Sequence, residues 1–226
     1  MEYRFEMLHE FLRSHHRELI DRCKEKVAKR FEPAETPAAM DHGVPLFLQQ
    51  LADTLRTEQS TPTRGIVHPE STPFDSEIGR AAAMHGAEML RLGFTVDQVV
   101  HEYGDVCQSV TDLAVEEKIQ ISTDEFRTLN RCLDNAIADA VTSFGLARQI
   151  RINDQAEDLH TRLGAFADEY ARLVDSAMQA FSAIKTGNVG VTGATGSLLV
   201  HTLMELRYLA ERTLPEIRLA SATTTT

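Results

Sequence analysis

Apolar residues recur along most of the chain at intervals of three and four, the spacing that places them on one face of an α-helix. The alternation of apolar and polar residues that marks half-buried strands is essentially absent. The pattern therefore predicts an all-α protein, in which an N-terminal helical bundle is joined by a long helix to a C-terminal helical hairpin.

The first third of the chain holds two apolar stripes. One lies within residues 5–23 and is closed by Pro33, because proline disrupts a helix interior. The other covers residues 44–55. Residues 59–74 contain three prolines among Ser, Thr and Glu, a composition typical of surface loops. We therefore expect two helices followed by a loop.

A start signal follows this loop. Thr72-Pro73 with Asp75 combines a cap residue, a first-turn proline and an early carboxylate, so we expect a helix from there to about Gly93.

Two capping boxes come next, formed by Thr95 with Gln98 and by Ser122 with Glu125. In this motif the side chains of the first and fourth residues each bond the backbone N–H of the other. Each box predicts the start of an amphipathic helix. The expected core face of the first helix is Val99, Tyr103, Val106, Val110 and Leu113. That of the second is Phe126, Leu129, Leu133, Ala136, Ala140 and Phe144.

The second of these helices has no stop signal. No proline occurs between Ser122 and Lys185, so the pattern predicts one long helix that links the two halves of the chain. After the loop Gly187–Gly196, a further helix shows the same alternation by threes and fours. Two helices make too thin a core, so we expect two chains to pair their hairpins into a four-helix bundle. The expected dimer core is Leu163, Phe166, Tyr170, Leu173, Leu199, Leu203 and Leu206.

Composition narrows the range of partners. The formal charge of −11 over 226 residues repels phosphate backbones and anionic lipids, so neither nucleic acid nor a membrane surface is expected as a partner. No window approaches the roughly 18 apolar residues of a membrane span, and the N-terminal residues lack the pattern of a signal peptide. We therefore expect a cytoplasmic protein that binds proteins or small molecules.

Residue types with catalytic or ligand chemistry are present but are not arranged in recognisable motifs. The three cysteines form no C-x-x-C pair, so we expect buried thiols rather than disulfides or zinc ligands. The loop Gly187–Gly196 lacks the lysine of a phosphate-binding loop and follows a helix. The histidines, among them His85 and His101, have no ligand-spaced partners. No cofactor is expected, although haem between the N-terminal helices stays open as an alternative.

The stretch L-G-A-F-A-D-E-Y-A-R-L-V-D-S-A, Leu163 to Ala177, resembles the H-box pattern F-A-H-E-x-R-N of sensor histidine kinases. The resemblance extends over residues 155–219, which are similar to the dimerisation and histidine-phosphotransfer domain of that family. In the family, the box histidine attacks the γ-phosphate of ATP and the adjacent acidic residue helps to remove its proton.

The resemblance places three residues at the phosphoacceptor region. Asp168 stands at the position of the histidine, Glu169 matches the acidic residue, and Arg172 stands where Asn or Thr is common. Receiver-type aspartates accept phosphate within a pocket of further acids, and no such pocket is visible around Asp168. The sequence also leaves no room for an ATP-binding domain after the second bundle helix. We therefore expect a protein without kinase activity, whose surface at these residues corresponds to the docking site of response regulators in the family.

The N-terminal part has a resemblance of its own. The stretches D-H-G-V-P-L-F-L, H-G-A-E-M-L-R-L-G-F-T-V-D-Q-V-V-H-E-Y-G-D-V-C-Q and F-R-T-L-N-R-C-L-D-N-A-I-A-D-A-V resemble the helical sensor module of some histidine kinases and of RsbR-type stress-signalling proteins. The expected domains are a sensor over residues 1–148, a dimerising hairpin over 149–220 and a disordered tail over 221–226.

These observations predict a non-catalytic, homodimeric, histidine-kinase-like signalling protein that binds or sequesters a response regulator or a sensor kinase. Two alternatives stay open. One is a phosphotransfer protein that uses His160 or His201 in place of the missing histidine. The other is a sensor of a small molecule or haem.

Overall fold

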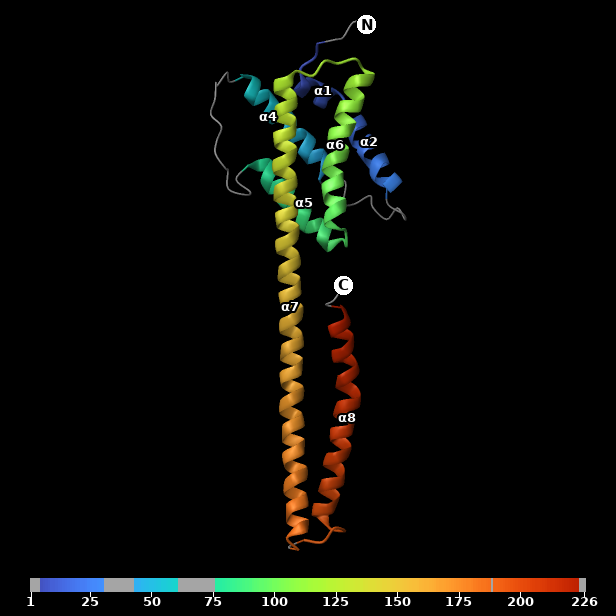
Figure 1. The fold of residues 1–226 in the computed structure, drawn as a ribbon, viewed down its shortest axis with the longest axis vertical. Coiled ribbons are helices and arrows are strands. Elements are labelled where there is room, and N and C mark those ends of the chain that lie inside the picture. The colour runs from blue at the N-terminus through green and yellow to red at the C-terminus, as the bar shows by residue number, and fades with distance from the viewer. Residues whose placement is uncertain (1–4, 31–42, 61–75, 188, 224–226) are drawn as a thin grey trace. The chain divides into compact units, whose positions relative to one another are not determined.

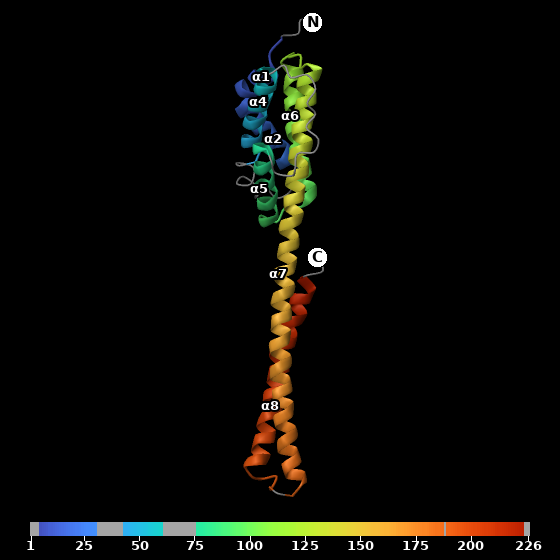
Figure 2. The same ribbon diagram turned by 90° about the vertical axis from the view of Figure 1, so that its left-hand side faces the viewer.

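The computed structural model describes residues 5–30, 43–60, 76–187 and 189–223, and these form helices without a β-strand (Figures 1 and 2). The all-α prediction is confirmed. The chain divides into two compact units, residues 1–148 and 149–226, and α7 contributes residues to both. The helices are α1 (Leu8–Ser14), α2 (His16–Arg30), α4 (Val44–Ser60), α5 (Glu77–Arg91), α6 (Val96–Glu116), α7 (Thr123–Lys185) and α8 (Ala194–Thr223).

Unit 1 encloses one hydrophobic core, to which α1, α2, α4, α5, α6 and the first part of α7 contribute. Every residue of the predicted core face of α6 is buried. The prediction for α7 holds except at Phe126, which is 41% exposed. The stripe in residues 5–23 forms two helices rather than one. His15, the residue between them, leaves the helical conformation, and its Nδ1 lies 3.1 Å from the carbonyl O of Phe11.

Helix starts follow the local capping chemistry. The box of Thr95 is complete, because the Thr95 N–H donates to Gln98 Oε1 at 2.7 Å and the Gln98 N–H donates to Thr95 Oγ1. For α5, the side chain of Ser76 is the cap and accepts from the Gly79 N–H at 2.9 Å. The predicted cap at Thr72 lies outside the described residues.

The second box fastens the start of α7 to the start of α1. The Ser122 N–H donates to Glu125 Oε2 at 3.0 Å, and the Glu125 N–H donates to Ser122 Oγ at 3.2 Å. The other carboxylate oxygen, Glu125 Oε1, accepts from the Leu8 N–H at 2.8 Å. Because the first N–H groups of a helix have no partner within it, this bond satisfies a group that burial would otherwise leave unpaired.

Helix α5 lies directly against the backbone of α7. A Cβ added to Gly86 would meet the carbonyl O of Ala140 at 2.0 Å, so only glycine fits at this contact. Two turns earlier along α5 the contact is different, since a Cβ on Gly79 would meet a side-chain oxygen of Asp139, the residue before Ala140. Glycines therefore allow the close approach of α5 to α7 at both positions.

The cysteines behave as buried apolar residues. Burial raises the pKa of Cys23 and of Cys132 to about 11, whereas Cys107 is only half-buried and its pKa is raised by burial to a smaller extent. Thiolate is the reactive form, and a thiol of pKa about 11 is roughly one-thousandth ionised at pH 8.

We expect iodoacetamide to label Cys107 first in the folded protein, as read by mass spectrometry. Equal labelling of all three in the absence of denaturant would contradict the buried positions.

Unit 2 consists of the later part of α7 and of α8, which lie side by side in an antiparallel hairpin (Figures 1 and 2). The predicted long helix is confirmed, since α7 runs without interruption over 63 residues. The glycine-rich segment connects the two helices. Helix α8 continues to Thr223, three residues into the segment expected to be a tail. The residues buried in the hairpin include Leu173, Ala177, Ala180, Thr202 and Leu209.

Candidate functional site

The three residues that the resemblance aligns with the phosphoacceptor region, Asp168, Glu169 and Arg172, lie on the surface of α7 within unit 2. Arg172 donates two hydrogen bonds to Glu169, from Nε to Oε2 at 2.9 Å and from Nη2 to Oε1 at 2.6 Å. The hydrogen bonds from Arg172 hold the pKa of Glu169 below its usual range. Asp168 is exposed and makes no hydrogen bond or ion pair within the described part of the chain. The site thus offers one uncommitted carboxylate beside a carboxylate that is already paired.

Helix α8 adds two polar residues to the same side of the hairpin. His201 Nε2 lies 3.2 Å from Glu205 Oε1, and Glu205 acts electrostatically on Arg172 across the two helices. The residues adjacent to His201 in the sequence, Val200 and Thr202, are not acidic. The acid lies one helical turn later. We use the name polar face for the set Asp168, Glu169, Arg172, His201 and Glu205.

His160, the other alternative phosphoacceptor, lies elsewhere on α7. It is exposed, and no hydrogen bond or ion pair joins it to another described residue. Its angular position about the helix axis differs from that of Asp168 by roughly 80°, because eight residues advance a helix by a little over two turns. The structure therefore brings His201, but not His160, to the side of the hairpin that carries Arg172.

The seven residues of the expected dimer core fall into two groups. Leu173 is buried within a single chain, and Phe166, Leu199 and Leu206 are half-buried. The remaining three stay exposed: Leu163 by 41%, Tyr170 by 48% and Leu203 by 51%. The hairpin of one chain therefore covers only part of the apolar surface that its sequence provides.

These exposed side chains are arranged in two stripes beside the buried seam. On α7, the stripe is rotated about the helix axis by roughly a quarter turn from Leu173, in the sense in which the helix winds from the N- to the C-terminus. On α8, measured from Leu209, Leu203 and Leu214 are displaced by a third of a turn or slightly more in the same sense, and Val200 by about half a turn. Because the helices are antiparallel, this places both stripes on one side of the hairpin. We call them together the apolar flank: exposed Leu163, Tyr170 and Phe181 with half-buried Val174 on α7, and exposed Val200, Leu203 and Leu214 on α8.

The polar face lies on the other side. Asp168 and Arg172 are displaced from Leu173 in the opposite rotational sense to the apolar flank, as is His201 from Thr202. The exposed side chains of Met204 and Tyr208 on α8 also lie on this side, so it is polar only around the five residues of the polar face. Continuous apolar stripes such as those of the apolar flank are what a helical pair shows when one side is covered in an assembly. The two sides are thus available for two different contacts.

Unit 1 contains a buried ionisable pair that sequence reasoning missed. His85 on α5 and Glu102 on α6 are 8% and 3% exposed, and His85 Nε2 lies 2.8 Å from Glu102 Oε2. The sequence did not indicate the pair, because no ligand spacing links residues on separate helices. The signal that could have identified the pair is that Glu102 and His85 both fall on the apolar faces of their helices.

The surroundings of His85 leave no open position for a haem iron. Glu102 occupies Nε2, and on the opposite side the ring carbons and Nδ1 lie 2.6–3.0 Å from where a Cβ of Gly43 would stand. In the described part of the chain, no group of three or more His, Cys, Asp or Glu residues could hold a metal ion. The haem alternative therefore receives no support from the geometry of this histidine.

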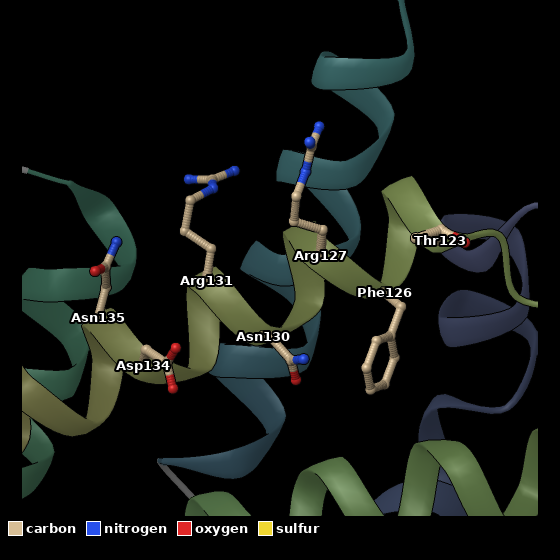
Figure 3. A pocket seen from close by; sticks show the side chains of 7 residues that line it. All are labelled: Thr123, Phe126, Arg127, Asn130, Arg131, Asp134 and Asn135. Atoms are coloured by element: carbon tan, nitrogen blue, oxygen red, sulfur yellow. The ribbon is translucent and has the colours of Figure 1, made fainter. Parts of the chain in front are cut away.

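A pocket of about 510 Å³ lies along the first part of α7 (Figure 3). Arg127 and Arg131 extend to one side of the helix, and Phe126 and Asn130 extend to the other. Both guanidinium groups are already neutralised, Arg131 by Glu58 and Arg127 by Asp124. All the lining residues come from one helix, so the pocket is a shallow surface depression without a committed recognition group.

No helix within the described ranges has the length and apolar content needed to span a bilayer. Comparisons with known proteins do not assign the chain to a family: no family model matches it, and no curated protein or solved structure shows a significant similarity.

Proposed function

We propose that the chain is a non-catalytic, dimeric signalling adaptor, in which unit 1 receives an input and unit 2 pairs with a second copy while presenting its polar face to a partner protein. The observation that carries the proposal is the division of the hairpin into an apolar flank and a polar face. A second copy suits the apolar flank because twofold pairing lays an identical apolar surface against it. The polar face then remains accessible.

The chemistry of the polar face favours binding over catalysis. Asp168 is a carboxylate where an acceptor imidazole would be needed, and no metal-ligand set surrounds it among the described residues. Glu169 is held by Arg172. Exposed charged groups of this kind guide association and specificity rather than bond formation. By its resemblance to the phosphotransfer domain, we propose the receiver domain of a response regulator as the partner class.

Phosphate transfer from a receiver domain tests this assignment. A receiver domain phosphorylated with acetyl phosphate is mixed with the unsubstituted chain, with Asp168→His and with the matched control Asp168→Asn. We expect acid-labile phosphate on the chain only with Asp168→His, because only an imidazole at that position accepts the group. Binding of the receiver domain by the unsubstituted chain is measured separately by calorimetry. Absence of both binding and transfer to Asp168→His would contradict the assignment.

The contact between His201 and Glu205 favours a second candidate function, phosphotransfer through His201. A carboxylate hydrogen-bonded to an imidazole orients the ring and assists removal of its proton. In the same experiment, this alternative requires acid-labile phosphate on the unsubstituted chain. It further requires that the phosphate is lost in His201→Gln and kept in His160→Gln.

A further inference from the structure

The pair His85–Glu102 in unit 1 has an unbalanced hydrogen-bonding arrangement. Glu102 Oε2 meets His85 Nε2, whereas Glu102 Oε1 is buried and has no hydrogen-bond partner among the described residues. A buried carboxylate oxygen without a donor is costly, because burial removes the water that would otherwise solvate it. With a neutral imidazole and an ionised carboxylate, the pair would carry one net negative charge in this position.

Within the ranges that the structure describes, the groups next to the pair do not offset that charge. Asp105, one turn further along α6, is fully buried and has interactions of its own. Burial raises the pKa of Tyr103 and of Cys23, so both stay neutral at physiological pH. The ring of Tyr103 stands edge-on to that of His85, and Gly43, just before α4, contacts the ring from the other side. The other charged groups near these neighbours are Asp139 on α7, near Tyr103, and Lys26 on α2, near Cys23.

We propose that His85 and Glu102 form a proton-binding site, which in folded unit 1 holds one proton between the two side chains at pH values where the same side chains of the unfolded chain share none. The proton makes the pair neutral as a whole, whether it resides on the imidazole or on the carboxyl group. Because the two side chains share one short hydrogen bond, the bound proton belongs to the pair.

The pair lies beside the contact between α5 and α7, so a change at the pair acts on that contact. His85 precedes Gly86, whose backbone lies against that of α7 at Ala140. Contacts between backbones transmit small displacements directly, because no flexible side chain intervenes. Proton binding is thus a candidate for the input that unit 1 receives. This assignment rests on the proposed signalling function, whereas the existence of the proton-binding site is independent of that function.

Unfolding of the full chain by urea, at pH values from about 6 to about 8, tests the site. A folded state that retains a proton longer than the unfolded state loses stability as pH rises, by up to about tenfold in the folding constant per pH unit. We expect this slope in the unsubstituted chain and in the matched control His101→Gln, which alters an exposed histidine near Asp97. Glu102→Gln and His85→Gln should give a shallower slope. Equal slopes in all four proteins would overturn the proposal.

Imidazole ¹⁵N and carboxyl ¹³C spectra of the unsubstituted chain read the same site without a substitution, in case the variants fail to fold. At about pH 7 we expect either a protonated His85 ring or a protonated Glu102 carboxyl group. A neutral ring beside an ionised carboxylate would overturn the proposal. The unfolding slopes are compared at one protein concentration, and neither readout requires a dimer or a partner to form, so failure of the proposed function would leave these results interpretable.

Discussion

Leu203→Glu should convert the protein from a dimer into a monomer. Leu203 belongs to the apolar flank and is 51% exposed within one chain, so the substitution leaves the hairpin's own buried seam intact. In a twofold dimer the change occurs twice, and each buried, unpaired carboxylate costs several kcal/mol. Since about 1.4 kcal/mol corresponds to a tenfold change, we expect the dissociation constant to rise at least about a thousandfold.

Sedimentation velocity over a range of concentrations measures this effect. The matched control is Leu198→Glu, which introduces the same residue at a 49% exposed position of α8 outside the apolar flank. The unsubstituted chain and the control should sediment at twice the mass of the 25.2 kDa chain. A monomeric unsubstituted chain would refute the dimer. Loss of the dimer in the control alone would place the interface on the other side of the hairpin.

Gly86→Ala should destabilise unit 1 by about 3 kcal/mol, the upper end of what an overpacked position costs. The added Cβ would lie 2.0 Å from the carbonyl O of Ala140, and a helix backbone cannot move aside as a side chain can. Because a domain is stable by only about 5–15 kcal/mol, the loss is a substantial fraction of the total. Urea unfolding followed by circular dichroism gives the difference.

Gly104→Ala on α6 provides the control for helix propensity. A Cβ at Gly104 meets nothing within 4 Å, so this variant should be more stable than the unsubstituted chain, by up to about 1 kcal/mol. The two substitutions are chemically identical and both occur within helices. If they shifted the unfolding midpoint in the same direction, the close approach of α5 to α7 would be wrong.

Local signals in the sequence predicted the helices well where the capping chemistry is short-range. The boxes at Thr95 and Ser122 involve residues three positions apart, so both partners of each bond lie within four consecutive residues of the sequence. The continuity of α7 follows in the same way from the absence of proline. The break at His15 was not predictable by these rules, because it depends on how a half-buried ring bonds to the turn before it.

The candidate sites were less predictable, because they depend on how helices are placed in space. Heptad spacing identified Leu203 and Leu173 as members of one seam, whereas the hairpin buries only Leu173. The contact of His85 with Glu102 joins α5 to α6, and no local rule pairs residues 17 positions apart on different helices. Sequence periodicity gives the face of each helix, but not which neighbour covers it.

The bond between Glu125 and the Leu8 N–H bears on how the protein is made by the ribosome. It spans 117 residues, so the newly synthesised N-terminal helices emerge before the segment that completes their core exists. During that interval, the side of the core later covered by Leu129, Leu133 and Phe144 faces the cellular milieu. The nascent chain therefore depends on chaperone protection, or on fast elongation, until about two thirds of it has been translated.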